Sequence, residues 1–138
     1  MEFDLVMIPT DSTLRVVRPT DNLNQIAVMY SKALGFEMLK QFKDHEGFDG
    51  VVLGHQKHAY HLEFIHQIGT TVGKAPSPEH LLVFYVDCSQ MWERACRKMI
   101  DAGFVVVESN NPYWETVGKT FEDIDGYRVV LQNRDWDL

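Results

Sequence analysis

The chain has only two cysteines, few basic side chains and no long apolar segment. Cys88 and Cys96 lie in apolar helical context rather than in a spaced framework, so we expect two buried free thiols and a reducing compartment. The chain has 13 Lys and Arg and 20 Asp and Glu, which gives a formal net charge of −7. Because phosphate binding needs a basic face and these basic residues are scattered, we expect no nucleic-acid partner.

The opening residues MEFDLVMIPTDST lack both the basic start and the apolar stretch of a signal peptide or membrane span. We therefore expect a cytoplasmic protein with no membrane partner. What the 138 residues do contain is 45% hydrophobic side chains. A chain of this size buries roughly two thirds of its unfolded surface, so one compact core is feasible.

The first half of the sequence predicts a strand, a helix and three further strands. TLRVVRPT, residues 13–20, has the β-branched character of a strand, and the following segment changes to apolar residues at three- and four-residue steps. Asn22 and Gln25 predict a capping box at the start of that helix, and Gly35 predicts a left-handed stop at its end. The three strand-like runs then fall within residues 36–67.

The second half repeats this order after a polar linker over residues 68–79. HLLVFYVD predicts a strand, CSQMWERACRKMIDAG a helix that ends at Gly103, and three strands follow. We therefore expect an α+β protein of two βαβββ repeats, which form an open barrel-like, concave eight-stranded arrangement with the helices on the outside. The predicted divisions are an arm over 1–12, a first module over 13–67, the linker, and a second module over 80–135.

Five short motifs together resemble the vicinal oxygen chelate superfamily, which includes glyoxalase I, extradiol dioxygenases and bleomycin resistance proteins. They are YSKALGF at the end of the first helix, HLEF in the fourth strand, LLVFYVD opening the second half, NPYW, and FEDIDGYRVVL near the C-terminus. The resemblance spans residues 13–133. It implies paired βαβββ modules with one open cavity per site, often in a dimer, so we expect a homodimer.

Enzymes of that superfamily hold a divalent metal through one position on each of the first, fourth, fifth and eighth strands. The resemblance carries these positions over to Arg15, Glu63, Leu81 and Val130. Only Glu63 can ligate a metal, because a guanidinium has no lone pair to give and Leu and Val have no ligand atoms. We therefore expect no metal and no other cofactor. A register shifted by one residue would bring His80 to the cavity in place of Leu81, although the strand's alternation favours Leu81.

The segment HAYHLEFIHQ, residues 58–67, alternates like a strand, so His61 and Glu63 should share the face that lines the cavity. Two ligands seldom suffice for tight metal binding, and a hydrogen-bonding pair that orients a ligand is the favoured interpretation. Arg15 or Arg18 is expected to reach Glu63. Arg15 would then serve either as a structural ion pair or as a grip on an anionic ligand group.

NPYW places Tyr113 and Trp114 at the expected cavity rim, where they would stack on a ligand or pack against the other half or a dimer partner. Asp123 and Asp125 bracket a hairpin turn whose chemistry explains them. The full set of candidate ligand-binding residues is Arg15, Arg18, His61, Glu63, Tyr85, Tyr113, Trp114 and Arg128.

The first functional hypothesis is a metal-independent protein of this superfamily that encloses a planar or aromatic small molecule, with a drug-resistance or sequestration role. The alternative is a metal-dependent lyase, isomerase or dioxygenase of the glyoxalase type, which would hold Zn, Ni, Mn or Fe. A metal-free enzyme would use Glu63 as base and His61 as proton carrier. A purely structural domain, with its cavity filled by side chains, is the remaining interpretation.

Overall fold

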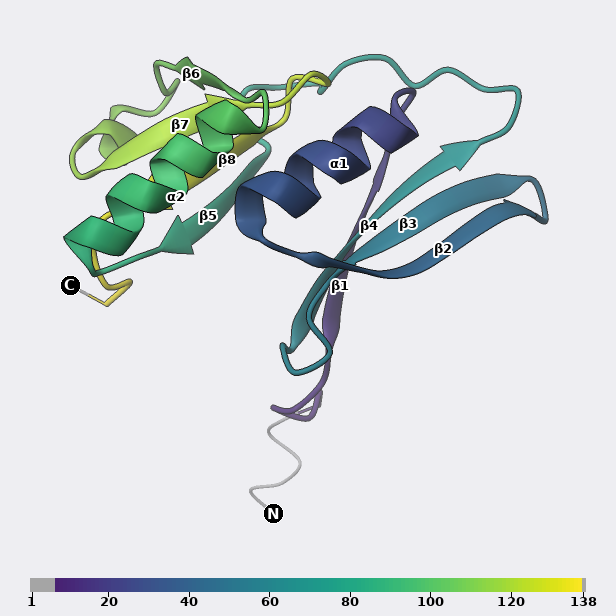
Figure 1. Ribbon diagram of the computed structural model, residues 1–138, viewed down its shortest axis with the longest axis horizontal. Coiled ribbons are helices and arrows are strands. Elements are labelled where there is room, and N and C mark those ends of the chain that lie inside the picture. The colour runs from purple at the N-terminus through teal and green to yellow at the C-terminus, as the bar shows by residue number, and fades with distance from the viewer. Residues whose placement is uncertain (1–6, 138) are drawn as a thin grey trace.

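The computed structural model describes residues 7–137, and its elements follow the order strand, helix, three strands twice over (Figure 1). The N-terminal module comprises β1 (Leu14–Pro19), α1 (Leu23–Leu34), β2 (Glu37–His45), β3 (Phe48–Gly54) and β4 (Tyr60–Gln67). The C-terminal module comprises β5 (Leu81–Tyr85), α2 (Ser89–Asp101), β6 (Val105–Val107), the 3-10 helix η2 (Pro112–Glu115), β7 (Gly118–Glu122) and β8 (Arg128–Gln132). The predicted arm over residues 1–12 lies partly outside the described residues.

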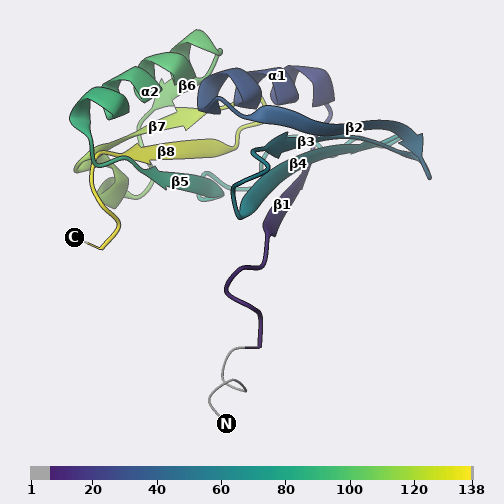
Figure 2. The same cartoon turned by 60° about the horizontal axis from the view of Figure 1, so that its bottom comes forward.

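Each module contributes one four-stranded mixed sheet. The strand orders are β1-β4-β3-β2 and β5-β8-β7-β6, and in each sheet the first strand of the module runs parallel to the last. The two helices lie next to each other on the same side of the sheets (Figure 2). The predicted α+β class with two repeats is confirmed, and the sheets stay separate and open rather than closing into a barrel.

Helix α1 ends at the predicted residue, but the hydrogen bonds at its start differ from the predicted capping box. Gly35 takes the left-handed conformation with φ of 69°, which confirms the predicted stop. The predicted capping box is wrong, because the Asn22 side chain makes no capping hydrogen bond. Its amide instead donates to Asp125 at 2.9 Å, and the Thr20 hydroxyl accepts the Asn22 backbone N–H. The side chain is thus used for a contact between modules that local sequence does not reveal.

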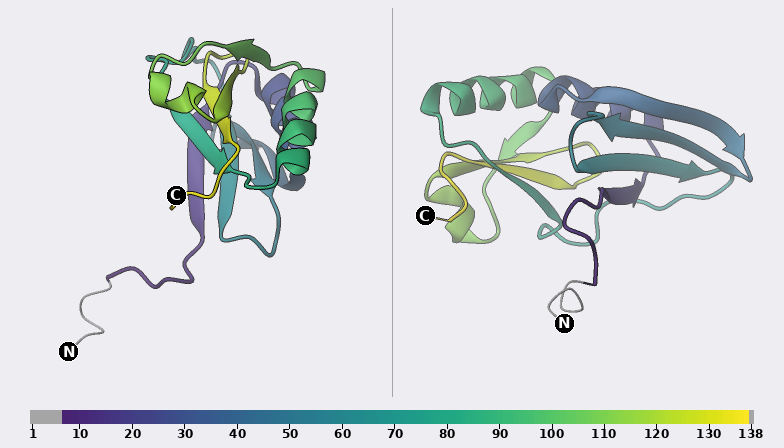
Figure 3. Two further views of the ribbon diagram at one scale, coloured as in Figure 1. Left: turned by 90° about the vertical axis from the view of Figure 1, so that its left-hand side faces the viewer. Right: turned by 90° about the horizontal axis from the view of Figure 1, so that it is seen from below.

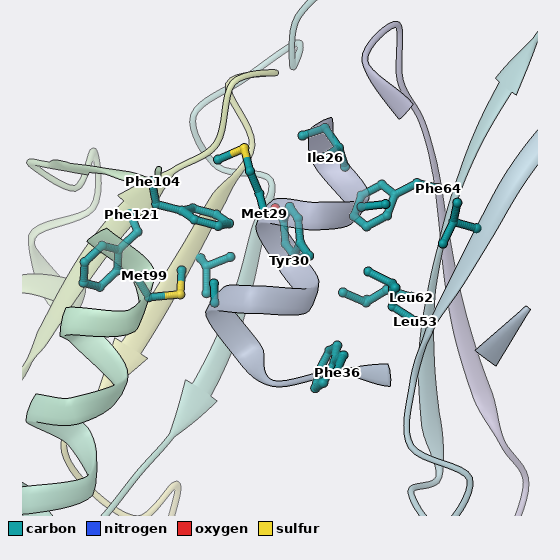
Figure 4. Packing of buried hydrophobic residues seen from close by; sticks show 14 of the residues in the cluster. Ile26, Met29, Tyr30, Phe36, Leu53, Leu62, Phe64, Met99, Phe104 and Phe121 are labelled. Atoms are coloured by element: carbon teal, nitrogen blue, oxygen red, sulfur yellow. The ribbon is translucent and has the colours of Figure 1, made fainter. Parts of the chain in front are cut away.

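The two modules share one apolar core beneath the helices (Figure 4). Tyr30 of α1 is at its centre, with its ring 4.9 Å from the ring of Phe64 in β4 and 5.1 Å from that of Phe104 in the C-terminal module. Met99 and Phe121 continue the cluster on the C-terminal side. Since large buried side chains each contribute about 1.5–3 kcal/mol, burial against a common helix holds the modules together.

The thiols and the membrane prediction can be compared directly with the structure. Both cysteines are free, and Cys96, on the inner face of α2, is buried as expected. The expected burial of Cys88 is wrong, because it occupies the position just before α2 and is exposed there. Within residues 7–137, no helix is long and apolar enough to cross a membrane.

Candidate functional site

The open face of the N-terminal sheet carries Arg15, His61 and Glu63. In the parallel pairing of β1 with β4, Arg15 lies opposite His61 and Val17 opposite Glu63. The alternate residues Val16, Leu62 and Phe64 pack into the core under α1. Because side chains alternate across a strand, the three polar groups project together from the other face.

Arg15 is the centre of a small polar cluster on that face. Its Nη1 donates to Glu63 Oε1 at 3.1 Å, and its Nη2 lies 3.5 Å from His61 Nδ1. The predicted contact between Arg15 and Glu63 is therefore confirmed. The Glu63 side chain is only 15% exposed and the Arg15 side chain 44% exposed. The carboxylate thus has its charge neutralised by the guanidinium, which keeps donors available toward solvent.

A hollow of about 360 Å³ lies beside this cluster, between the β1–β4 edge and β5. It is lined from the N-terminal module by Leu14, Val16, Tyr60 and His61, and from the C-terminal module by Val83 and Tyr85, among others. Burial raises the pKa of Tyr60, so its hydroxyl stays protonated at neutral pH. The hollow therefore offers apolar walls, two aromatic rings and an imidazole that is next to Arg15.

The corresponding face of the C-terminal sheet is covered by the chain itself. Val130 on this face is 0% exposed, and its neighbours Thr120 and Gln132 are also buried. The turn that contains η2 lies over this side of the sheet, opposite α2 (Figure 3). The Ser109 and Thr120 hydroxyls share a hydrogen bond, and the Trp114 carbonyl approaches Gly118.

The four positions inherited from the metal-binding relatives are split between the two sheets. Arg15 and Glu63 share a face of the first sheet, whereas Leu81 and Val130 share a face of the second, since Leu81 pairs with Arg128 and Val83 with Val130. In the described part of the chain, no group of three or more His, Cys, Asp or Glu side chains is placed to hold a metal. The donor set here does not fit a divalent ion, because the single carboxylate is already bonded to a guanidinium.

The remaining sequence-predicted residues lie elsewhere. Arg18 points to the helix side, where its guanidinium stacks over Tyr127 at 3.9 Å and lies 3.4 Å from the Tyr30 hydroxyl. Arg128 is paired with Glu122 at 3.1 Å on the second sheet. Tyr113 and Trp114 form an edge-to-face pair in η2, with ring centroids 4.9 Å apart. The structure thus joins Arg15, His61 and Glu63 in one cluster, and His61 shares the lining of the hollow with Tyr85. The other four candidates, Arg18, Arg128, Tyr113 and Trp114, line neither this cluster nor the hollow.

Sequence reasoning missed a set of buried hydrogen bonds between the modules, which Tyr30 and Thr20 form with Asp123 and Asp125 and which is here called the seam. The Tyr30 hydroxyl donates to Asp123 at 2.6 Å, and the Thr20 hydroxyl donates to Asp125 at 2.6 Å. Burial raises the pKa of Asp123, and burial together with the nearby carboxylate raises the pKa of Tyr30 well above its ordinary value. The predicted turn role of Asp123 is confirmed, because its carboxylate also accepts two backbone N–H groups. The available signal was Tyr30 itself, whose hydroxyl on a buried helix face requires a partner.

Comparison with known proteins finds relatives that match most of the chain. Residues 14–65 match the YycE-like N-terminal domain and residues 79–133 match the YycE-like C-terminal domain. The protein YycE of Bacillus subtilis, itself uncharacterized, is 39% identical over 120 residues, which cover 87% of this chain and 86% of the relative. A crystal structure of a YycE protein of unknown function from Bacillus subtilis has a TM-score of 0.83, 38% identity and 91% coverage of both chains.

Two more distant solved structures share the fold. The fosfomycin resistance protein FosX of Mesorhizobium loti has a TM-score of 0.68 at 10% identity, covering 95% of this chain and 96% of its own. TnmS3, an antibiotic binding protein from Streptomyces sp. CB03234, has a TM-score of 0.61 at 17% identity, covering 92% and 97%. At such identities the likeness concerns architecture alone.

Proposed function

The chain belongs to the YycE-like family of the vicinal oxygen chelate superfamily, and from this premise we propose that it is a metal-independent, cytoplasmic small-molecule-binding protein. Its ligand is planar or aromatic, and a homodimer encloses it against the face that carries Arg15, His61 and Glu63. The role is sequestration of a small molecule, as in drug resistance. FosX is a resistance protein and TnmS3 an antibiotic binding protein, so this fold supports both kinds of role.

The observation that carries the proposal is the bond between Arg15 and Glu63 at 3.1 Å. Glu63 is the one inherited position with a ligand atom, and a fixed positive charge lies against it. A cation at this carboxylate would displace the guanidinium or be repelled by it. One carboxylate and one imidazole are also fewer than the three protein ligands usual in a catalytic zinc site. Chemistry that needs a Lewis acid is therefore poorly supported here.

The same groups suit recognition of a flat polar molecule. The planar guanidinium of Arg15 can stack on a ring or donate paired hydrogen bonds, and His61 can accept or donate beside it. Tyr60 and Tyr85 supply aromatic faces to the hollow. Its volume of about 360 Å³ falls within the usual range for small-molecule sites, roughly 300–1,000 Å³. The ligand's rings would contact the apolar wall while its polar edge meets Arg15 and His61.

The proposal is tested by metal analysis and ligand screening of the untagged protein. After exposure to nickel, zinc, manganese and iron followed by dialysis, elemental analysis should find no stoichiometric metal. A thermal-shift screen of planar aromatic compounds should then find stabilising ligands, whose effect grows with concentration by mass action. Tyr85→Ala and His61→Ala should abolish the shift. Tyr113→Ala, which removes an aromatic ring outside the hollow, should preserve it.

Tightly held metal at one ion per chain would overturn the proposal and favour the glyoxalase-type enzyme. A chain that holds no metal and also responds to no aromatic compound would favour a purely structural domain.

A further inference from the structure

A second hollow, here called the interhelical groove, lies on the opposite, helix-bearing side of the molecule. Its volume is about 390 Å³, and it runs between the C-terminal end of α1 and the helix α2. Aromatic rings from Phe36, Tyr60 and Phe84 form part of its apolar lining, together with Leu131 of β8. The Tyr60 and Phe84 rings, 6.4 Å apart, also line the hollow on the other side. The two hollows therefore adjoin at these rings and differ in the rest of their lining.

The charged groups that line the interhelical groove are all basic. Arg94 and Lys98 project from α2, and His55 and His58 come from the turn between β3 and β4. No Asp or Glu is among the lining residues, in a chain whose net charge is −7. At the rim of the groove, Glu37 Oε1 lies 3.6 Å from His55 Nδ1.

Arg94 and Lys98 form an unfavourable pair within their own helix. They are four residues apart and therefore lie one above the other on the helix surface, where like charges destabilise the helix. Among residues 7–137 neither side chain forms an ion pair or a side-chain hydrogen bond. Two unneutralised cations thus face an apolar floor, an arrangement that an anionic head group on an apolar body would complete.

We propose that the interhelical groove binds an apolar carboxylate, with its ring or chain against Phe36, Tyr60 and Phe84 and its carboxylate held by Arg94 and Lys98. The Arg94 guanidinium can bind a carboxylate through two parallel hydrogen bonds, and Lys98 adds a second charge. The Tyr60 hydroxyl is uncharged at neutral pH, and burial raises its pKa further above the ordinary 10.0, so the floor carries no competing negative charge. This site does not use Arg15, although it shares the Tyr60 and Phe84 rings with the hollow proposed for the other ligand.

The test titrates 2-naphthoate into the isotopically labelled full-length chain and follows backbone amide shifts by NMR. Saturable shifts are expected along α2 around residues 91–98 and in the turn over residues 55–60. The cation 2-naphthylmethylammonium has the same ring system and should not bind there. The double variant Arg94→Gln with Lys98→Gln should weaken 2-naphthoate binding by about tenfold or more, since two charge-assisted contacts are lost.

Arg97→Gln is the control, because it removes one positive charge from an exposed position of α2 that does not line the groove. It should leave the affinity nearly unchanged, and Arg15→Ala should leave it unchanged as well. The proposal is wrong if the cation binds equally, if the double variant binds normally, or if millimolar 2-naphthoate shifts no groove resonances. Shifts confined to the open face around His61 would instead support only the function proposed above.

Discussion

Arg15 sets the electrostatic character of the open face, since its guanidinium is bonded to Glu63 and lies beside His61. Its contribution to folding is small. Partly exposed ion pairs contribute about 0–1 kcal/mol, and the Arg15 side chain is 44% exposed. Under the proposed function, Arg15 matters more for its effect on metal binding at this face, because its positive charge repels a metal cation and competes with it for the Glu63 carboxylate.

That view predicts that Arg15→His creates a metal site. Arg15 and His61 are direct neighbours across parallel strands, so the substitution would place a second imidazole beside His61 and Glu63. Three donors of these types suit Zn²⁺ or Ni²⁺. Isothermal titration calorimetry should show Ni²⁺ binding at least about tenfold tighter than in the parent chain.

Adding Glu63→Gln to Arg15→His is the control, because it removes the carboxylate and should lose most of the gain. If Arg15→His binds Ni²⁺ no better than the parent, these three positions do not converge as described.

The Asp123 carboxyl predicts a specific dependence of stability on pH. Burial raises its pKa above the ordinary value of 3.8, so the folded chain retains a proton that the unfolded chain has lost. Rising pH therefore lowers the free energy of unfolding from about 3.8 until the folded pKa is passed. Asp123→Asn has no such titration, while its carbonyl can still accept the backbone N–H groups.

Urea unfolding of both proteins at several pH values from about 4 to 7 measures this effect. The free energy of unfolding of Asp123→Asn minus that of the parent should rise across this interval. A constant difference would show that burial does not raise the Asp123 pKa.

At the scale of elements, the turn that contains η2 closes the open face of the C-terminal sheet. A Cβ on Gly118 would overlap Gln132 Oε1 and lie 2.8 Å from the Trp114 carbonyl oxygen. Gly118→Ala should therefore destabilise the protein by about 1–3 kcal/mol through overpacking, as measured by urea unfolding. Thr116→Ala, at an exposed position of the same turn, should change stability by less than about 0.5 kcal/mol.

Parent-like stability of Gly118→Ala would contradict this close packing. It would mean that the turn can move away from β7, and that the face beneath it is open to a ligand after all.

The sequence predicts well the features that are determined by residues close together in the chain. The stop at Gly35 follows from one backbone conformation, and the shared face of His61 and Glu63 follows from strand alternation. The seam cannot be predicted from local sequence, because Tyr30 and Asp123 are 93 residues apart. Asn22 was misassigned for the same reason, since its amide serves Asp125 of the other module rather than its own helix.

The candidate site shows the same division. The resemblance brought Arg15 to Glu63 correctly, because a fold-wide alignment of strands carries long-range information. It placed Tyr113 and Trp114 near the cavity, whereas they form their own pair in η2 outside the hollow. Strand alternation predicts that only one of Arg15 and Arg18 reaches Glu63, and the structure shows that Arg15 does so while Arg18 lies on the opposite face.

For the whole molecule, the seam and the linker join the modules into one unit. Tyr30 and Thr20 bond to Asp123 and Asp125 across the boundary. The Asp21 carboxylate accepts N–H groups from the linker at Val72 and Gly73, and these bonds lower its pKa. The linker therefore lies fixed against the first module, and the hollow between β1 and β5 has walls of defined spacing.

Within residues 7–137, one side of that hollow is left open. β1 and β5 are both sheet edges, and Val17 on the open face of β1 is 51% exposed. An exposed apolar edge strand invites pairing with another chain, so we predict a homodimer that covers this face. Sedimentation velocity should show a dimer, and Val17→Asp should raise its dissociation constant by at least about tenfold, since it buries an unpaired charge beside Glu63.

Val105→Asp is the matched control, because Val105 is 63% exposed at the far edge of the other sheet, on β6. It introduces the same charge without touching β1, and the dimer should persist. Dissociation by Val105→Asp but not by Val17→Asp would place the dimer contact on β6 and leave the ligand face open to solvent. A monomer in the parent chain would remove the enclosure itself. The residues of one chain would then contact only one side of the ligand. The binding affinity would have to come from Arg15 and the aromatic rings of the hollow alone.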